Sequence, residues 1–189
     1  MKNIILSMSL LLLVACAYSP QQITISPKVD TSVESFGNGR VVTVAAEDGR
    51  ANKALGTRGG IYKETSVITI ANDIALAVAR AAEARLAVEG FNVHSDDADV
   101  AHLKIIIDKL TYDTPDQSVG KKVLLSASLK VVGTAGGETF TGQYTSNSER
   151  QTVITPSMAR NEEMINTLLS DTLARMFADP KLKAFLSNI

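Results

Sequence analysis

The sequence contains one cysteine, Cys16, which stands directly after a short apolar segment in the order Leu13, Val14, Ala15, Cys16. A chain with one cysteine cannot form an internal disulfide, so any domain that it folds into must depend on an apolar core. Hydrophobic residues make up 45% of the 189 residues, which is enough for one domain of ordinary size. The position of Cys16 also predicts how the chain is processed.

The first fifteen residues have the features of a signal peptide. Lys2 precedes an apolar stretch from Ile4 to Ala15 that only two serines interrupt. This stretch is shorter than the roughly 20 apolar residues that span a bilayer. Small residues before a cysteine are typical of a lipobox, where the chain is cut and the new N-terminal cysteine is acylated. We therefore predict a signal peptide over residues 1–15 and a lipid on Cys16; the alternative is a secretory signal with a chance cysteine.

The residue after the cysteine predicts the membrane that holds the anchor. In Gram-negative lipoproteins an aspartate at this position commonly retains the protein in the inner membrane. Position 17 is an alanine. We therefore expect an outer-membrane anchor with the chain on the periplasmic face, and two or three acyl chains would hold it there permanently.

Composition divides the rest of the chain into a tether and one domain. Residues 16–39 contain two prolines and two glycines among polar residues. They predict the lipidated Cys16 followed by a tether, with one short edge strand where residues 22–26 alternate. Residues 40–189 are expected to form a single periplasmic domain.

Five segments of this domain have the patterns of strands. The β-branched runs 41–46 and 65–69 predict a hairpin with an unusually long loop. A strand is expected over residues 103–110, and alternation predicts two more over 123–131 and 138–151. These last two form a hairpin whose outer face is rich in hydroxyl groups.

Three segments have the patterns of helices. Residues 72–89 are rich in Ala, Leu, Arg and Glu and end before Gly90. Arg85 in this helix is expected to be a snorkelling side chain or a member of a structural ion pair, in preference to a ligand-binding residue. The pairs Thr155–Pro156 and Asp179–Pro180 each combine a capping residue with a proline at the first helical position. The predicted fold class is α+β, a mostly antiparallel sheet with two main helices packed on one face and a short C-terminal helix.

Several weak motifs extend over nearly the whole chain. They are the lipobox, Ile23–Pro27, Asp48–Arg50, Gly90–Phe91, Ile105–Ile107 and Leu169–Ala174. Together with the order of elements, they give a sequence that resembles the YajG-type lipoproteins, small envelope proteins of Gram-negative bacteria. The resemblance implies an α+β domain with helices on one face of a mostly antiparallel sheet. It implies no activity, cofactor or catalytic residue.

Charge and motifs argue against two classes of function. The chain has 19 basic and 20 acidic side chains, and its longest basic run is Lys121–Lys122. Because phosphate binding needs a net basic surface, no nucleic-acid partner is expected. No Gly-x-Ser-x-Gly motif is present. We therefore predict a protein that is not an enzyme and uses no cofactor, although a periplasmic enzyme is kept as a third hypothesis.

Two histidines and three aspartates lie close together in the sequence and could suggest a metal site. They are His94, Asp96, Asp97, Asp99 and His102. Donors that all lie in one turn are more often a solvated loop, in which aspartates cap the turn. We therefore predict no metal site.

The loop of residues 49–60 is the most suggestive candidate for binding. It contains Arg50, Lys53 and Arg58 among glycines, and a basic, glycine-rich loop can cradle an anion, although this one lacks the ending of a P-loop. The alternative is a structural pair between Asp48 and Arg50. We predict an accessory or docking module of an envelope assembly whose protein partner contacts this loop. The competing hypothesis is a small-ligand protein that binds an anion there.

Overall fold

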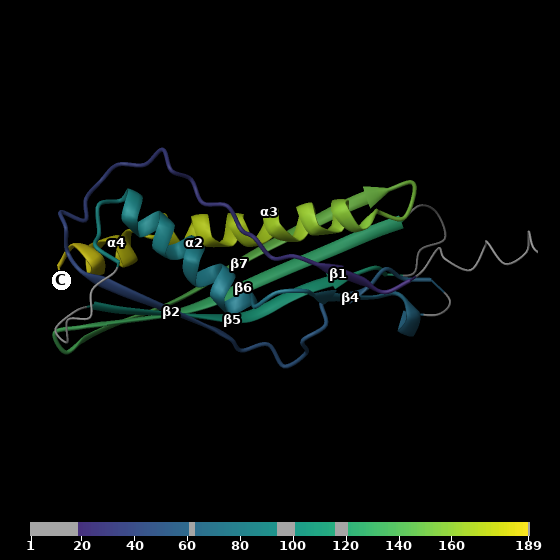
Figure 1. Ribbon diagram of the computed structural model, residues 1–189, viewed down its shortest axis with the longest axis horizontal. Helices are drawn as coiled ribbons and strands as arrows, with labels where there is room; N and C mark the ends of the chain where they lie inside the picture. Colours follow the sequence, from purple (N-terminus) through teal and green to yellow (C-terminus); the bar gives the residue numbers. More distant parts are fainter. Residues whose placement is uncertain (1–18, 61–62, 94–100, 116–120, 189) are drawn as a thin grey trace, which may run out of the picture.

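The computed structural model describes residues 19–60, 63–93, 101–115 and 121–188. Within them the fold is α+β, with a seven-stranded sheet and three helices (Figure 1). The strands are β1 Gln21–Ile23, β2 Val42–Asp48, β3 Gly56–Thr57, β4 Val67–Ile70, β5 Ala101–Asp113, β6 Lys121–Ala135 and β7 Glu138–Thr152. The helices are α2 Ile74–Val88, α3 Met158–Phe177 and α4 Pro180–Ser187, with a short 3-10 turn η2 at Lys63–Thr65.

The sheet is mostly antiparallel, as predicted. Its strands follow the order β1-β4-β3-β5-β6-β7, and β2 also pairs with β5. The long antiparallel pairs β5–β6 and β6–β7 form most of the sheet, whereas β1–β4, β2–β5 and β3–β5 are parallel. The two ends of this order, β1 and β7, are the edges that matter for the candidate site.

The predicted hairpin between residues 41–46 and 65–69 is wrong. β2 pairs with β5, and β4 lies between β1 and the two-residue strand β3. A Cβ atom at Gly56 would overlap the carbonyl group of Tyr112, so only glycine allows β3 to lie this close to β5. Local sequence patterns predict that a segment is a strand, but they do not identify its partner.

The alternating and helical patterns are confirmed in the core. The odd-numbered residues of β6 from Val123 to Val131 are buried, and α3 packs mainly on β7 and β6. Leu129 lies in the same buried cluster as Leu169 and Leu173 of α3. Helix α3 begins one residue after its N-cap Ser157, and not at Thr155–Pro156 as predicted. Helix α2 packs mainly on β2.

The tether predicted for residues 16–39 is wrong from Gln21 onward, although the short edge strand expected within it is present as β1, at Gln21–Ile23. Ile23 and Ile25 are buried in the core, and Phe36 packs edge-on against Phe91 with ring centroids 5.2 Å apart. Figure 1 shows this part of the chain crossing over the helices toward β2. Residues 24–36, which we name the strap, therefore belong to the folded domain.

A buried ion pair holds the strap to the helices. Arg85 donates to Glu89 at 2.8 Å and to the carbonyl oxygen of Asp30 at 3.0 Å. Its guanidinium also lies 5.6 Å from the ring centroid of Phe177. The structural ion pair expected for Arg85 is confirmed, and it joins α2, α3 and the strap.

Candidate functional site

The loop of residues 49–60 does not present its arginines to solvent. Arg50 is only 5% exposed and donates to both carboxylate oxygens of Asp48, at 2.8 and 3.0 Å. These hydrogen bonds lower the pKa of Asp48 to about 2. The Lys53 ammonium lies 3.1 Å from the same carboxylate, with its side chain 63% exposed. The pair between Asp48 and Arg50 therefore exists. The Asp48 carboxylate neutralises the positive charge that would otherwise bind an anion.

Arg58 has a different role from Arg50 and Lys53. Its side chain is buried, and it donates to the carbonyl oxygen of Ser19 at 3.2 Å. The three cations of the loop thus form two separate sets of contacts and do not converge on one cradle. The loop also contains β3, so it is not the unstructured segment that the sequence predicts.

Several other residues singled out in the sequence fall outside the described residues. These are Cys16, Ala17, His94, Asp96, Asp97 and Asp99. His102 is described; it is exposed on β5, with Nδ1 2.6 Å from the Thr43 hydroxyl. Within the described ranges, no three His, Cys, Asp or Glu side chains gather as metal ligands would.

The edge formed by β1 and its continuation to Lys28 is sealed by side chains. The backbone N–H groups of Thr24, Ser26 and Lys28 donate to Glu162, Asn166 and Ser170 of α3, at 2.8, 2.7 and 2.9 Å. The Asn166 amide also donates to the carbonyl oxygen of Thr24 at 2.9 Å. On the other side, Asn72 bonds both the N–H and the carbonyl of Ile25. We name residues 21–28 the sealed edge.

The opposite edge has no such cover. β7 pairs along its whole length with β6, and in the described part of the chain no strand pairs with its outer side. The half of β7 near the turn is packed by α4, where Phe140 stacks on Phe185 and the Tyr144 hydroxyl donates to Asp179 at 2.6 Å. We name β7 the open edge.

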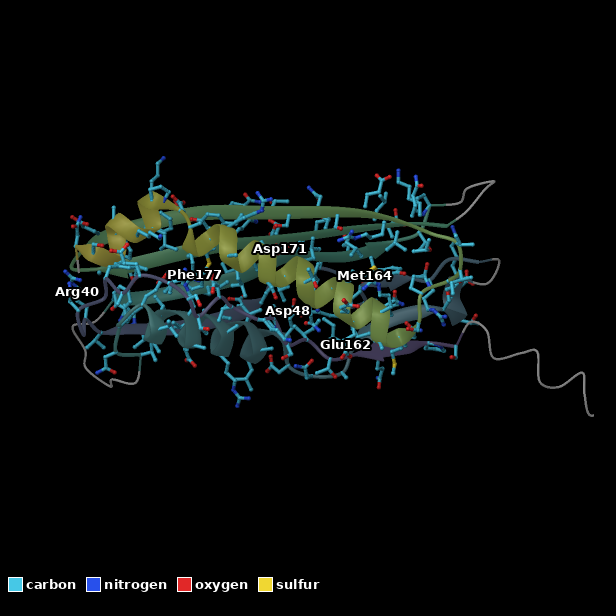
Figure 2. The ribbon with its side chains drawn as sticks, turned by 90° about the horizontal axis from the view of Figure 1, so that it is seen from above. Arg40, Asp48, Glu162, Met164, Asp171 and Phe177 are labelled. Atoms are coloured by element: carbon cyan, nitrogen blue, oxygen red, sulfur yellow. The ribbon has the colours of Figure 1, made fainter. Side chains whose placement is uncertain are left out.

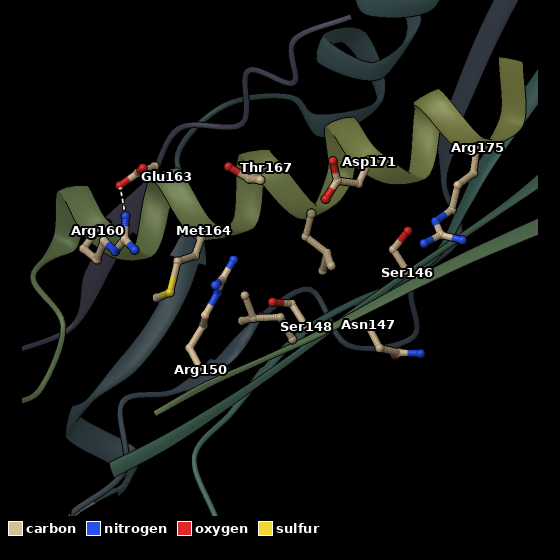
Figure 3. A pocket seen from close by; sticks show the side chains of 12 residues that line it. Ser146, Asn147, Ser148, Arg150, Arg160, Glu163, Met164, Thr167, Asp171 and Arg175 are labelled. Atoms are coloured by element: carbon tan, nitrogen blue, oxygen red, sulfur yellow. Dashed lines mark hydrogen bonds and ion pairs between the residues drawn. The ribbon is translucent and has the colours of Figure 1, made fainter. Parts of the chain in front are cut away.

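A groove lies between the other half of β7 and α3 (Figure 3). Its volume is about 230 Å³, and β7 contributes Ser146, Ser148 and Arg150 to its lining. Helix α3 lines the groove with the polar flank that faces away from the sealed edge. The lining residues from this flank are Arg160, Glu163, Thr167, Asp171 and Arg175. Figure 2 shows Glu162 and Asp171 on opposite flanks of α3, one toward the sealed edge and the other toward the groove.

The groove holds polar groups without partners. Arg160 pairs with Glu163, whereas Arg150, Arg175 and Asp171 have no ion pair among the described residues. Ser146 is only 5% exposed and points from β7 toward α3, yet its hydroxyl has no hydrogen-bond partner there (Figure 3). A buried hydroxyl without a partner is costly, so a polar group that enters the groove and reaches this hydroxyl would stabilise it. The loop hypothesis missed this groove, although the four-residue spacing of its α3 side chains is visible in the sequence.

Comparison with known proteins identifies the family but not a reaction. A family model described as "Uncharacterized lipoprotein" matches residues 27–187. The uncharacterized lipoprotein YajG of Escherichia coli strain K12 is 22% identical over 184 residues, which cover 95% of this chain and 93% of that protein.

Two crystal structures are similar to the fold. Protein XCC0632 from Xanthomonas campestris gives a TM-score of 0.50 at 10% identity, covering 89% of this chain and 99% of that one. A minor lipoprotein from Acinetobacter baumannii gives 0.45 at 12% identity, covering 79% and 94%. None of the described helices combines the length and apolar character needed to cross a bilayer. With the family model matching most of its length, the chain belongs to the YajG-type family of uncharacterized lipoproteins.

Proposed function

We propose that this lipoprotein is a docking module of an envelope assembly, anchored by Cys16 at the periplasmic face of the outer membrane, and that it binds an extended segment of a protein partner along β7. The observation that carries the proposal is the asymmetry of the sheet. One edge is sealed by side chains of α3, whereas the fifteen-residue strand β7 is unpaired on its outer side in the described structure. An unpaired edge offers a row of backbone donors and acceptors to a partner strand.

The arginines of the groove beside β7 favour a partner segment with acidic side chains. Arg150 and Arg175 line the groove without ion pairs among the described residues, and Asp171 is the acidic group there that also lacks one. Arginine binds carboxylates through paired hydrogen bonds, so an acidic segment would gain specificity as well as affinity. The free hydroxyl of Ser146 would add one more contact.

The position of the anchor rests on sequence and family. The family consists of lipoproteins, and Cys16 is the one residue of this chain that can carry a thiol-linked lipid. Ala17 favours the outer membrane over retention in the inner membrane. The absence of a catalytic motif favours docking over an enzymatic role.

Charge reversal in the groove tests the proposal. The double variant Arg150→Glu and Arg175→Glu should reduce recovery of the crosslinked partner at least tenfold, because it places like charges opposite an acidic segment. Arg80→Glu is the matched control, since Arg80 is an exposed arginine on α2. Equal recovery from the double variant and the control, with both proteins folded, would refute docking in this groove.

A further inference from the structure

Exposed apolar side chains are concentrated in the connection between β7 and α3. Val153 is 95% exposed, Ile154 is 77% exposed and Met158 is 50% exposed. Among the described residues only two other large apolar side chains are exposed, Leu76 at 47% and Val88 at 36%, and both lie on α2. We name Val153, Ile154 and Met158 the apolar tip.

The apolar tip lies at the end of the domain from which the N-terminal segment leaves. The side-chain amides of Gln21 and Asn161, one turn into α3, are 2.8 Å apart. The other end of the Gln21 amide lies within hydrogen-bond distance of the Met158 N–H, at 3.3 Å, and of Arg58 Nε, at 3.2 Å. Arg58 in turn holds the carbonyl oxygen of Ser19. Figure 1 shows the start of β1, the end of β7 and the start of α3 at the same end of the long axis.

The lipid anchor cannot be far from this end. Cys16 precedes Ser19 by three residues, and three fully extended residues reach at most about 11 Å. A lipid on Cys16 therefore restricts the end that carries the apolar tip to the neighbourhood of the bilayer. At such a short distance the effective concentration of the membrane surface at the apolar tip is high. Even a weak affinity of the tip for the membrane therefore gives a well-populated inserted state.

We infer that the apolar tip rests in the phospholipid surface beside the anchor, as a second membrane contact. The domain then stands with its long axis pointing away from the bilayer. The open edge would run outward from the membrane, and the turn at Gly136–Gly137 would lie about 50 Å away, the length of a fifteen-residue strand. This inference depends on the lipid at Cys16 and not on docking at β7.

A single fluorescent label tests the contact. In the lipidated protein the thiol of Cys16 is occupied, so Ile154→Cys supplies one thiol for an environment-sensitive dye such as NBD. The full lipoprotein is reconstituted into vesicles of phosphatidylethanolamine and phosphatidylglycerol with spin-labelled lipid. We expect blue-shifted emission and strong quenching at position 154. Thr139→Cys, an exposed position at the far end of β7, should give emission as in water.

Three results would overturn the inference, two of them in the flotation and emission measurements. One is emission at position 154 that matches the position 139 control while the protein floats with the vesicles. The other is failure of the wild-type protein to float, since the contact requires the anchor. The aspartate variants Val153→Asp and Ile154→Asp provide an independent check: with a label at position 158, they should reduce quenching severalfold and leave thermal unfolding unchanged. A label that is quenched as strongly in these variants as in the parent would also contradict it.

Discussion

The sealed edge and the open edge differ in how their backbone groups are satisfied, although α3 lies beside both. At the sealed edge, Glu162, Asn166 and Ser170 accept hydrogen bonds from the backbone N–H groups of alternate residues. On the opposite flank, Glu163, Thr167 and Asp171 line the groove beside β7 without bonding its backbone in the described structure. One helix therefore covers one edge and leaves the other available. Of these two edges, β7 is therefore the one at which a partner can add hydrogen bonds without displacing existing ones.

Arg85→Ala should have the largest effect, because it releases the strap that continues the sealed edge. It removes the bond to the strap at Asp30 and leaves Glu89 buried without its counter-charge. Breaking a buried pair in this way costs about 3–5 kcal/mol. We expect a melting temperature lower by roughly 2–4 °C per kcal/mol lost. Arg80→Ala, on the exposed side of the same helix, should change it little, and similar losses from the two variants would show that the buried pair is not what matters.

Leu129→Ala should destabilise both edges together, because Leu129 lies in the core shared with α3. Truncation of a buried leucine costs about 2–5 kcal/mol. Thr141→Ala on β7, an exposed position, should stay within about 0.5 kcal/mol of the parent protein. Chemical denaturation measures both values. Equal changes would mean that the two faces of the β6–β7 hairpin are assigned incorrectly.

Neighbouring residues of α3 give the sharpest contrast between the flanks. Asn166→Ala removes hydrogen bonds to both Ser26 and Thr24 and should cost about 1–3 kcal/mol. Thr167→Ala, one residue later and facing the groove, should cost less than about 0.5 kcal/mol. Hydrogen exchange should show faster exchange at Ser26 in the first variant alone. Unchanged exchange at Ser26 in Asn166→Ala would argue against a sealed edge.

Asp48→Asn should have a smaller effect at neutral pH, because asparagine keeps one acceptor for Arg50. The folded-state pKa of Asp48 is about 2, below the value of roughly 3.9 in unfolded chains. Its ionisation therefore stabilises the fold above about pH 4, and this contribution is lost as the pH falls toward 2. Urea denaturation at pH 2–5 should show a flatter pH dependence in Asp48→Asn. A parallel profile for the two proteins would contradict the pairing with Arg50.

The periodic parts of the fold could be predicted from the sequence, whereas contacts between distant segments could not. Alternation in residues 123–131 and 138–151 predicts β6 and β7, because successive residues of a strand face opposite sides of the sheet and the type of each residue indicates which side is buried. The polar composition of residues 21–36 predicts a tether because it conceals two buried isoleucines, Ile23 in β1 and Ile25 in the strap. The α3 side chains that bind its backbone lie more than 130 residues away in the sequence.

The candidate site was harder to predict for a related reason. The sequence places Arg50, Lys53 and Arg58 close together, so they look like a cluster. In the structure Asp48 pairs with Arg50 and Lys53, whereas Arg58 donates to the carbonyl oxygen of Ser19. The groove joins residues of β7 to residues of α3, and no local pattern shows which flank of a helix will face a strand edge. Only the tertiary structure brings Ser146 and Asp171 to one groove.

The central claim is that the open edge binds a protein partner and the sealed edge does not. The most direct measurement is photo-crosslinking in living cells, with a photoreactive amino acid at Asn147 on β7 or at Lys28 on the sealed edge, both exposed positions. We predict a discrete crosslinked protein from position 147 and none from position 28. Crosslinks of equal yield from both positions, or from position 28 alone, would contradict the account.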